Sequence, residues 1–266
     1  MVSIIIACLN SGGTLKQALD SVFGQSYKDL EAIVIDGGSS DQTIEILRSF
    51  DQRLKVKSPA HIPPRREASV GRKKLKFFWK SEKDRGIADA FNKGVRMAHG
   101  DYIYFLGADD VLKHPNVIER MMKGVDPKKD LIICGKIDRI TLSKKYSVLY
   151  TSSIRFHPLL FLYKMTLPHQ GIFMHRKFFQ LYGLFDTQYK YAMDYDLLLR
   201  AYHEFPRVIL KDIVVAGWRE GGIGKNKLYE ILDEYHRIRM KNHIAPAWIL
   251  RIIHEIVKAR YRLVGL

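Results

Sequence analysis

Residues 102–112 read "YIYFLGADDVL", an apolar run that ends in two adjacent carboxylates. A run without polar alternation is typical of a central strand in a parallel sheet, because both faces of such a strand are covered. Open parallel sheets bind ligands beyond the carboxyl ends of their strands. Asp109 and Asp110 therefore occupy a position where a sheet of this kind would bind a ligand.

The same arrangement occurs twice nearer the N-terminus. The segments "VSIIIACLN" (2–10) and "LEAIVIDGGSSD" (30–41) are each an apolar strand followed by a polar turn. Apolar residues at helical spacing predict helices over 14–23, 43–50 and 87–100. This alternation predicts an α/β fold with a mostly parallel central sheet, right-handed crossovers and helices on both faces.

The second half of the chain is less regular. "DLIICGKIDRI" (130–140) and "KKYSVLY" (144–150) predict a hairpin. Two amphipathic helices are predicted to end the chain. The first is marked by Leu228, Ile231, Leu232, Tyr235 and Ile238, and the second, after Pro246, by Ile249, Ile252, Ile253, Ile256 and Leu263.

Charge is the most unusual feature of the composition. The 266 residues include 44 Lys and Arg against 28 Asp and Glu, a net charge of +16. Such an excess predicts an anionic partner, which could be a phosphorylated substrate, an acidic lipid surface or nucleic acid. Residues 55–76 hold eight of these cations and three prolines, which predicts an exposed and poorly ordered insertion.

The cysteines and the apolar runs indicate the cellular compartment that we expect for the protein. Cys8 and Cys134 both lie in apolar runs, which predicts core thiols of a reduced, cytosolic protein. No signal-peptide pattern is evident, and no apolar run reaches the roughly 18 residues of a membrane-spanning helix. Any membrane contact is therefore expected to be peripheral.

The last helix could serve two purposes. It carries Trp248 near its start and several cations among its polar positions, namely Arg251, Lys258, Arg260 and Arg262. It could dock on the rest of the protein with a solvated basic face, or lie on anionic lipid. We favour the lipid interpretation. Nucleic acid is disfavoured, because the chain has no recognisable nucleic-acid-binding motif.

The acids that follow the strands have ordinary explanations as well as functional ones. Asp36 could cap the turn "DGGSSD", or recognise an N–H or hydroxyl group of a ligand. Asp109 and Asp110 could form a turn before a helix, or hold a divalent cation. Mg²⁺ and Mn²⁺ are commonly bound by one or two carboxylates together with substrate phosphates.

Five segments follow one another along the chain: "SIIIACLN", "AIVIDGGSSDQT", "SEKDRGIADAFNKGVRMAHGDYIYFLGADD", "PHQGIFMHRKFF" and "YAMDYDLLLR". Taken in this order, they resemble family 2 glycosyltransferases of bacterial polysaccharide and lipid-linked glycan synthesis, which have the GT-A (Rossmann-like) fold. The resemblance implies a catalytic domain over 1–224, interrupted by the basic insertion, and a C-terminal helical extension over 225–266.

The resemblance also implies a binding site for a nucleotide-sugar donor. Asp36 would hydrogen-bond the base, expected to be uracil, and Asp89 would lie near the sugar. Asp109 and Asp110 match the family's metal motif, with Asp110 as the direct ligand of Mn²⁺ or Mg²⁺. Gly107 departs from that motif, because many relatives have an acid there. The other implied donor-site residues are Ala7, Leu9 and Asn10 around the base, and Asp84 and Arg85 near the base, ribose and diphosphate.

Asp194 occupies the position of the family's catalytic base, although Met193 replaces the acid that usually precedes it. The acid could also be a helix N-terminal residue that interacts with the helix dipole. As a base, Asp194 would deprotonate the acceptor hydroxyl as it attacks the anomeric carbon, and the in-line displacement would invert that centre. His169 and Gln170 would lie beside the acceptor and the diphosphate, and Asp196 is expected to be structural.

We therefore expect an inverting glycosyltransferase that moves a sugar from a UDP-linked donor to a hydroxyl of a glycan or lipid-linked acceptor. We expect it on the cytoplasmic face of the cell membrane, held there by basic segments. Two alternatives stay open at this point. One is a sugar nucleotidyltransferase, for which "NSGGTL" is a poor activating loop. The other is a catalytically inactive basic adaptor for membranes or nucleic acid.

Overall fold

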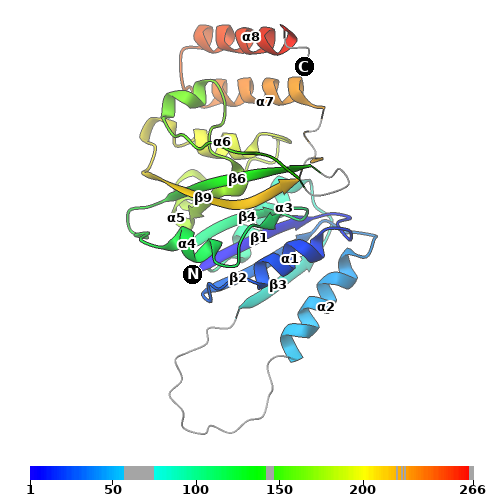
Figure 1. Ribbon diagram of the computed structural model, residues 1–266. Helices are drawn as coiled ribbons and strands as arrows, with labels where there is room; N and C mark the ends of the chain where they lie inside the picture. Colours follow the sequence, from blue (N-terminus) through cyan, green and yellow to red (C-terminus); the bar gives the residue numbers. More distant parts are fainter. Residues whose placement is uncertain (57–74, 142–146, 220, 223, 225, 264–266) are drawn as a thin grey trace.

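The computed structural model describes residues 1–56, 75–141, 147–219, 221–222, 224 and 226–263. Its centre is one sheet in the order β3-β2-β1-β4-β8-β6-β9-β5, with β7 paired to β6 (Figure 1). The strands are β1 (Val2–Cys8), β2 (Leu30–Asp36), β3 (Lys76–Ser81), β4 (Tyr102–Gly107), β5 (Val111–Leu112), β6 (Ile132–Thr141), β7 (Ser147–Thr151), β8 (Ile172–His175) and β9 (Val208–Arg219).

Helices cover both faces of this sheet, as predicted. The α-helices are α1 (Leu15–Phe23), α2 (Thr43–Val56), α3 (Ile87–Met97), α4 (Val117–Met122), α5 (Arg176–Tyr182), α6 (Met193–Leu199), α7 (Leu228–Lys241) and α8 (Ala247–Leu263). Three 3₁₀ turns complete the described elements: η1 (Pro158–Leu162), η2 (His169–Gly171) and η3 (Tyr202–Glu204).

Strand β1 is the centre of the parallel part of the sheet. It pairs in parallel with β2 on one side and with β4 on the other. Its side chains alternate between two cores, with Ile4 and Ile6 facing α1, α2 and α4 and Ile5 facing α3. All three are fully buried, which explains why the strand has no polar alternation.

The sheet is mostly parallel in its paired length, but antiparallel pairs appear where the sequence pattern becomes irregular. Strand β8 runs antiparallel to both β4 and β6, and β6 and β7 form the predicted hairpin. Strand β9 returns parallel to β6 and carries β5 antiparallel at its other edge. In the part of the chain that the structure describes, strands β6, β7 and β8 follow one another without an α-helix between them, because antiparallel neighbours need no helical crossover.

Helices α7 and α8 lie together at the end of the molecule farthest from β3 (Figure 1). Helix α8 buries Leu250, His254 and Val257 and stacks His254 on His236 of α7, with ring centroids 4.4 Å apart. The predicted helix is present, but two of the apolar residues that mark it do not pack on α7, because Ile252 and Ile256 are 51% and 60% exposed. Apolar residues surround much of this helix, so the sequence pattern does not identify the face that packs on α7.

Two further expectations concern the basic insertion and the membrane. Most of the predicted insertion, 57–74, lies outside the described residues, whereas residues 55 and 56 belong to α2. Helix α2 thus extends beyond its predicted end at residue 50.

Among the described helices, none is both long enough and apolar enough to cross a bilayer.

Candidate active site

Strand register places the predicted site residues at one edge of the sheet. Cys8 is level with Asp36, and Asp36 is level with Ser81 on the neighbouring strand. On the other side of β1, Ala7 is level with Gly107. The loops that follow β1, β2, β3 and β4 therefore leave the sheet side by side, which is where α/β sheets bind ligands.

The loops after β1 and β2 are joined by direct hydrogen bonds. The Asn10 amide donates to Ser39 Oγ at 2.7 Å, and the Ser40 amide donates to Asn10 Oδ1 at 3.0 Å. Asn10 has a φ of 50°, a left-handed conformation that asparagine adopts more readily than most residues. Beside it, Leu9 is 57% exposed. The loops form a braced surface next to Ala7, where the nucleotide base was expected.

Asp36 is fully buried at the end of β2. Its Oδ2 accepts hydrogen bonds from Ser81 Oγ at 2.6 Å and from the amides of Gly38 and Ser39 at 3.1 and 3.0 Å. Burial raises the pKa of this carboxyl, but the bonds from Ser39, Ser81 and the loop amides outweigh it, so the pKa lies below its ordinary value. The carboxylate fixes the shape of the loop that follows β2.

The loop between β3 and α3 brings Asp84 toward this carboxylate. A Cβ added to Gly37 would lie 2.6 Å from Asp84 Oδ2, so Asp84 rests against the residue that follows Asp36. Arg85 is 80% exposed on its side chain, and its amide donates to Asp89 Oδ2 at 3.2 Å. Asp84 is therefore close to the braced loops, and the Arg85 guanidinium is open to solvent.

Asp109 and Asp110 turn back toward the end of β4. A Cβ at Gly107 would lie 2.6 Å from Asp110 Oδ2 and 2.9 Å from Asp109 Oδ1. The glycine thus leaves room for both carboxylates beside the end of β4. Asp110 is 1% exposed and accepts a hydrogen bond from the Arg219 amide at 3.0 Å.

The electrostatics of Asp110 suit a cation. Burial, followed by the charge of Asp109, raises the pKa of Asp110 to about 7. Two adjacent carboxylates, one of them desolvated, are oxygen donors of the kind that hard divalent cations prefer. No group of three or more His, Cys, Asp and Glu side chains suited to a metal occurs in the part of the chain that the structure describes. A cation here would need further ligands from a substrate.

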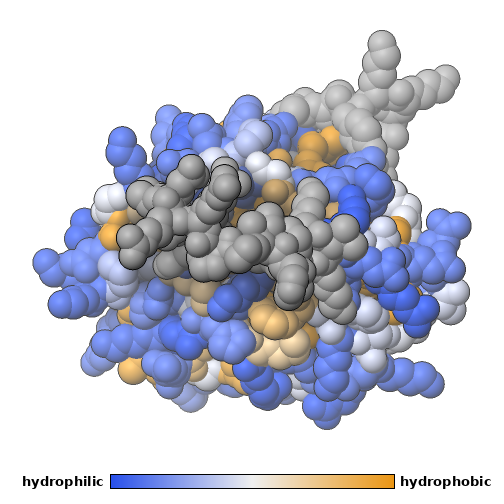
Figure 2. All heavy atoms as spheres, turned by 90° about the horizontal axis from the view of Figure 1, so that it is seen from below, coloured by the Kyte–Doolittle hydropathy of each residue, from blue (hydrophilic) through white to orange (hydrophobic). Residues whose placement is uncertain are grey.

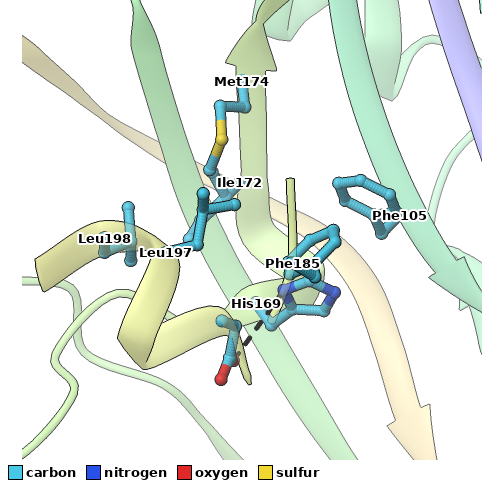
Figure 3. Close-up of a pocket in the computed structure, with 8 residues that line it drawn as sticks. Phe105, His169, Ile172, Met174, Phe185, Leu197 and Leu198 are labelled. Carbon is cyan, nitrogen blue, oxygen red and sulfur yellow. Dashed lines mark ion pairs between the residues drawn. The ribbon is translucent and has the colours of Figure 1, made fainter. Parts of the chain in front are cut away.

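Asp194 lies in the first turn of α6 and pairs with His169 of η2. Figure 3 draws this ion pair as a dashed line to His169. Asp194 Oδ2 is 3.8 Å from His169 Nδ1. The imidazole stacks on Phe91 and Phe105, with ring centroids 5.7 and 5.5 Å away. Burial lowers the pKa of His169, although Asp194 opposes this shift. A neutral, stacked imidazole thus borders one side of the carboxylate.

The space enclosed between these residues is too small for a sugar. The cavity lined by Phe105, His169, Phe185 and Asp194 has a volume of about 10 Å³, near the lower limit for one water molecule. Asp194 has 22% of its side chain exposed. A substrate would therefore approach the carboxylate from the solvent side.

Gln170 connects the His169 turn with the Asp109–Asp110 side of the site. Its carbonyl accepts a hydrogen bond from the Tyr104 hydroxyl at 2.8 Å. Burial, followed by the charge of Asp110, raises the pKa of that tyrosine. The strand that leads to Asp110 therefore also holds the turn that borders Asp194.

Comparison with known proteins identifies the family of this chain. The model of the family described as "Glycosyl transferase family 2" matches residues 3–182. The chain belongs to this family. The PGL/p-HBAD biosynthesis glycosyltransferase of Mycobacterium tuberculosis is 30% identical over 226 residues, 84% of this chain and 78% of that protein. An uncharacterized glycosyltransferase of Rickettsia prowazekii is 30% identical over 249 residues, 88% of this chain and 69% of that protein.

Solved structures share the fold of this glycosyltransferase. Residues 1–349 of S. aureus TarS, in complex with UDP-GlcNAc, superpose with a TM-score of 0.66 at 15% identity, covering 98% of this chain and 72% of that one. The full TarS chain is longer, and the match spans 43% of it. A mannosyltransferase of Pyrobaculum calidifontis, in complex with GDP-Man and Mn²⁺, has a TM-score of 0.60 at 16% identity, covering 100% of this chain and 76% of that one.

Arg219 is a further residue of the candidate site, and the sequence pattern did not indicate it. Its amide bonds Asp110, and its guanidinium bonds Gln17 of α1. It is 4% exposed. A buried arginine at a strand end is a detectable signal, but the contact with Asp110 depends on β9 reaching this edge of the sheet.

The Asp36 network predicts a pH-dependent stability. A carboxyl with a depressed pKa contributes stability above its ordinary value of 3.8 and loses it as pH falls through the folded value. We expect Asp36→Asn to lower the melting temperature at pH 7, and the difference from the wild type to shrink below pH 3.8. Thermal unfolding monitored by circular dichroism tests this. Glu45→Gln, an exposed acid of α2, is the control, and an equal difference at both pH values would contradict the assignment.

Proposed function

We propose that the chain is an inverting glycosyltransferase that moves a sugar from a UDP-linked donor to a hydroxyl of a glycan or lipid-linked acceptor. The observation that carries this proposal is the meeting of three polar groups at one edge of the sheet. These are the braced loops around Asn10 and Asp36, the Asp109–Asp110 pair, and Asp194, which the His169–Gln170 turn connects to β4.

The donor would lie across the ends of β1, β2 and β4. The base would occupy the surface beside Ala7, Leu9 and Asn10, and Arg85 is exposed enough to reach a phosphate. The TarS complex with UDP-GlcNAc supports a uridine nucleotide. The carboxylate of Asp36 is already satisfied by its own loop and by Ser81 of β3, so we infer that it acts on the base mainly by holding that loop in shape.

A divalent cation, Mn²⁺ or Mg²⁺, would be held by Asp110 and Asp109. The buried carboxyl with its raised pKa fits such an ion, because a bound cation would offset both the burial and the charge of Asp109. The mannosyltransferase complex with Mn²⁺ supports this proposal. When bound, the ion would supply positive charge to the leaving diphosphate.

Asp194 would act as the general base. An acceptor hydroxyl is a poor nucleophile at neutral pH, and a positioned carboxylate can remove its proton during the attack on the anomeric carbon. Asp196, the other acid of this helix, is fully buried and bonded to Arg200 and Lys241. Its position supports a structural role, which leaves Asp194 as the base of this segment.

Helix α8 supports attachment to an anionic membrane surface. Trp248, Ile252 and Ile256 are 65%, 51% and 60% exposed and follow one another at four-residue spacing, so they share one face. Arg251, Arg260 and Arg262 are exposed on the same helix. The opposite end of the molecule, seen in Figure 2, is mainly hydrophilic with small apolar patches. We infer that α8 lies on the cytoplasmic face of the cell membrane, near lipid-linked acceptors.

The base assignment predicts a specific loss of catalysis. Asp194→Asn should reduce UDP release from a nucleotide sugar by about 10²-fold or more, because a positioned general base contributes on that order. Affinity for UDP, measured by calorimetry, should remain unchanged. Asp212→Asn, whose side chain is 88% exposed on β9, is the matched control. Near-normal turnover of the Asp194 variant would remove the base from this position.

The metal assignment predicts coupled binding. UDP should bind the wild type at least about ten-fold more tightly with Mn²⁺ than without it, a difference of about 1.4 kcal/mol. Asp110→Ala should abolish that gain, whereas Asp212→Asn should retain it. Titration calorimetry of UDP with and without Mn²⁺ measures both. Equal affinity under all conditions would exclude a cation from this site.

The membrane assignment predicts a role for the exposed face of α8. Ile252→Asn combined with Ile256→Asn should reduce co-sedimentation with anionic phospholipid vesicles at least about ten-fold, since burying two isoleucines contributes a few kcal/mol. Leu159→Asn combined with Leu181→Asn, which are 60% and 57% exposed elsewhere, should bind like the wild type. High salt should weaken binding. Unchanged binding of the α8 variant, or its loss of self-association instead, would contradict the proposal.

A further inference from the structure

A buried carboxylate of α7 holds the segment that leads to the base. Glu234 is 4% exposed. Its Oε1 accepts a hydrogen bond from the Lys190 amide, and its Oε2 accepts bonds from the amides of Tyr191 and Ala192, each at 2.9 Å. Three consecutive backbone N–H groups therefore converge on one side chain that lies more than forty residues away in the chain.

These amides stand directly before the helix that carries Asp194. Ala192 is the residue before α6, and Asp194 is the second residue of that helix. At a rise of about 1.5 Å per residue, the base is only about 3 Å along the axis from the last clamped amide. Hydrogen bonds to a carboxylate are stronger than those between neutral groups. The orientation of the first turn of α6 is thus fixed from outside the helix.

Helix α7 contacts α6 at two further points. Tyr235 stacks on Tyr195, with ring centroids 4.3 Å apart. Lys241 Nζ lies 3.1 Å from Asp196 Oδ1. The contacts at Glu234, Tyr235 and Lys241 lie along a single helix, so α7 supports the base-bearing helix from its entry segment onward.

We propose that Glu234 is a positioning residue for the catalytic base: by clamping the amides of residues 190–192 it fixes the place of Asp194 relative to the donor and acceptor. The inference rests on the proposed function of Asp194. Displacement of a reacting group by about 1 Å can cost about 10²-fold in rate. Loss of the clamp therefore lowers turnover without touching the donor, whose expected contacts lie on β1, β2 and β4.

Glu230 offers a control on the same helix. It lies one turn before Glu234, and its contacts are with side chains, Tyr191 Oη at 2.8 Å and Lys227 Nζ at 2.7 Å. Its own side chain is 52% exposed. Glu230→Gln therefore changes an acid of the same helix that faces the same segment, but leaves the three backbone bonds of Glu234 in place.

The test compares Glu234→Gln with Glu230→Gln in the full chain. The Glu234→Gln substitution keeps the size of the side chain but turns an N–H donor group toward backbone donors. We expect kcat for UDP release to fall about 10- to 100-fold in Glu234→Gln, with KM for the donor and the affinity for UDP within about two-fold of the wild type. Glu230→Gln should match the wild type. The donors are UDP-GlcNAc, UDP-glucose and UDP-galactose with Mn²⁺.

Amide hydrogen exchange gives a second measurement that does not depend on turnover. The amides of residues 190–192 should exchange faster in Glu234→Gln and at the wild-type rate in Glu230→Gln. If Glu234→Gln does not fold, Glu234→Asp retains the charge on a shorter side chain, and its kcat should lie between those of the wild type and Asp194→Asn.

The outcomes separate the two proposals. Wild-type kcat in a folded Glu234→Gln or Glu234→Asp variant, while Asp194→Asn is inactive, overturns the positioning role and leaves the base assignment intact. Equal UDP release by the wild type and Asp194→Asn overturns the base assignment. In that case amide hydrogen exchange still tests the three hydrogen bonds of Glu234. If residues 190–192 exchange at the wild-type rate in Glu234→Gln, Glu234 does not hold this segment; if they exchange faster, it does.

Discussion

Parallel pairing of β1 with β2 and β4 is the constraint on which the site depends. Because the pairing is continuous, Cys8, Asp36 and Ser81 are level across three strands, and Ala7 is level with Gly107. The loops that follow these strands therefore all begin at the same edge of the sheet. Without this register the polar residues that follow the strands would be scattered along the sheet, and no common ligand could reach them.

The pKa values of two buried carboxyls at this edge are shifted in opposite directions. Asp36 is surrounded by hydroxyl and amide donors, which outweigh its burial and depress its pKa. For Asp110, burial and the charge of Asp109 outweigh the amide bond from Arg219, and the pKa rises to about 7. The first carboxylate is satisfied by the protein. The second is left without a neutralising charge, and this difference supports the proposal that Asp110 binds a cation whereas Asp36 shapes its loop.

Helix α6, which carries the proposed base Asp194, is held by parts of the chain that are distant in sequence. Its first turn is bordered by His169, which rests on Phe91 and Phe105. Its entry segment is bonded to Glu234 of α7. The two C-terminal helices therefore make different contacts. Helix α7 bonds the segment that leads into α6, whereas α8 packs on α7 and leaves an apolar face exposed.

The sequence by itself determined the strands, the acids that follow them and the family resemblance, because these features are local. An apolar run such as residues 102–106 specifies a buried strand, and the topology of parallel sheets places Asp36 and Asp110 at one edge. Tertiary structure alone decided the antiparallel course of β8, the exposed face of α8, and the contacts of Arg219 and Glu234. Each of these depends on which surfaces meet across long separations in the chain, and hydrophobic periodicity carries no information about the partner of a face.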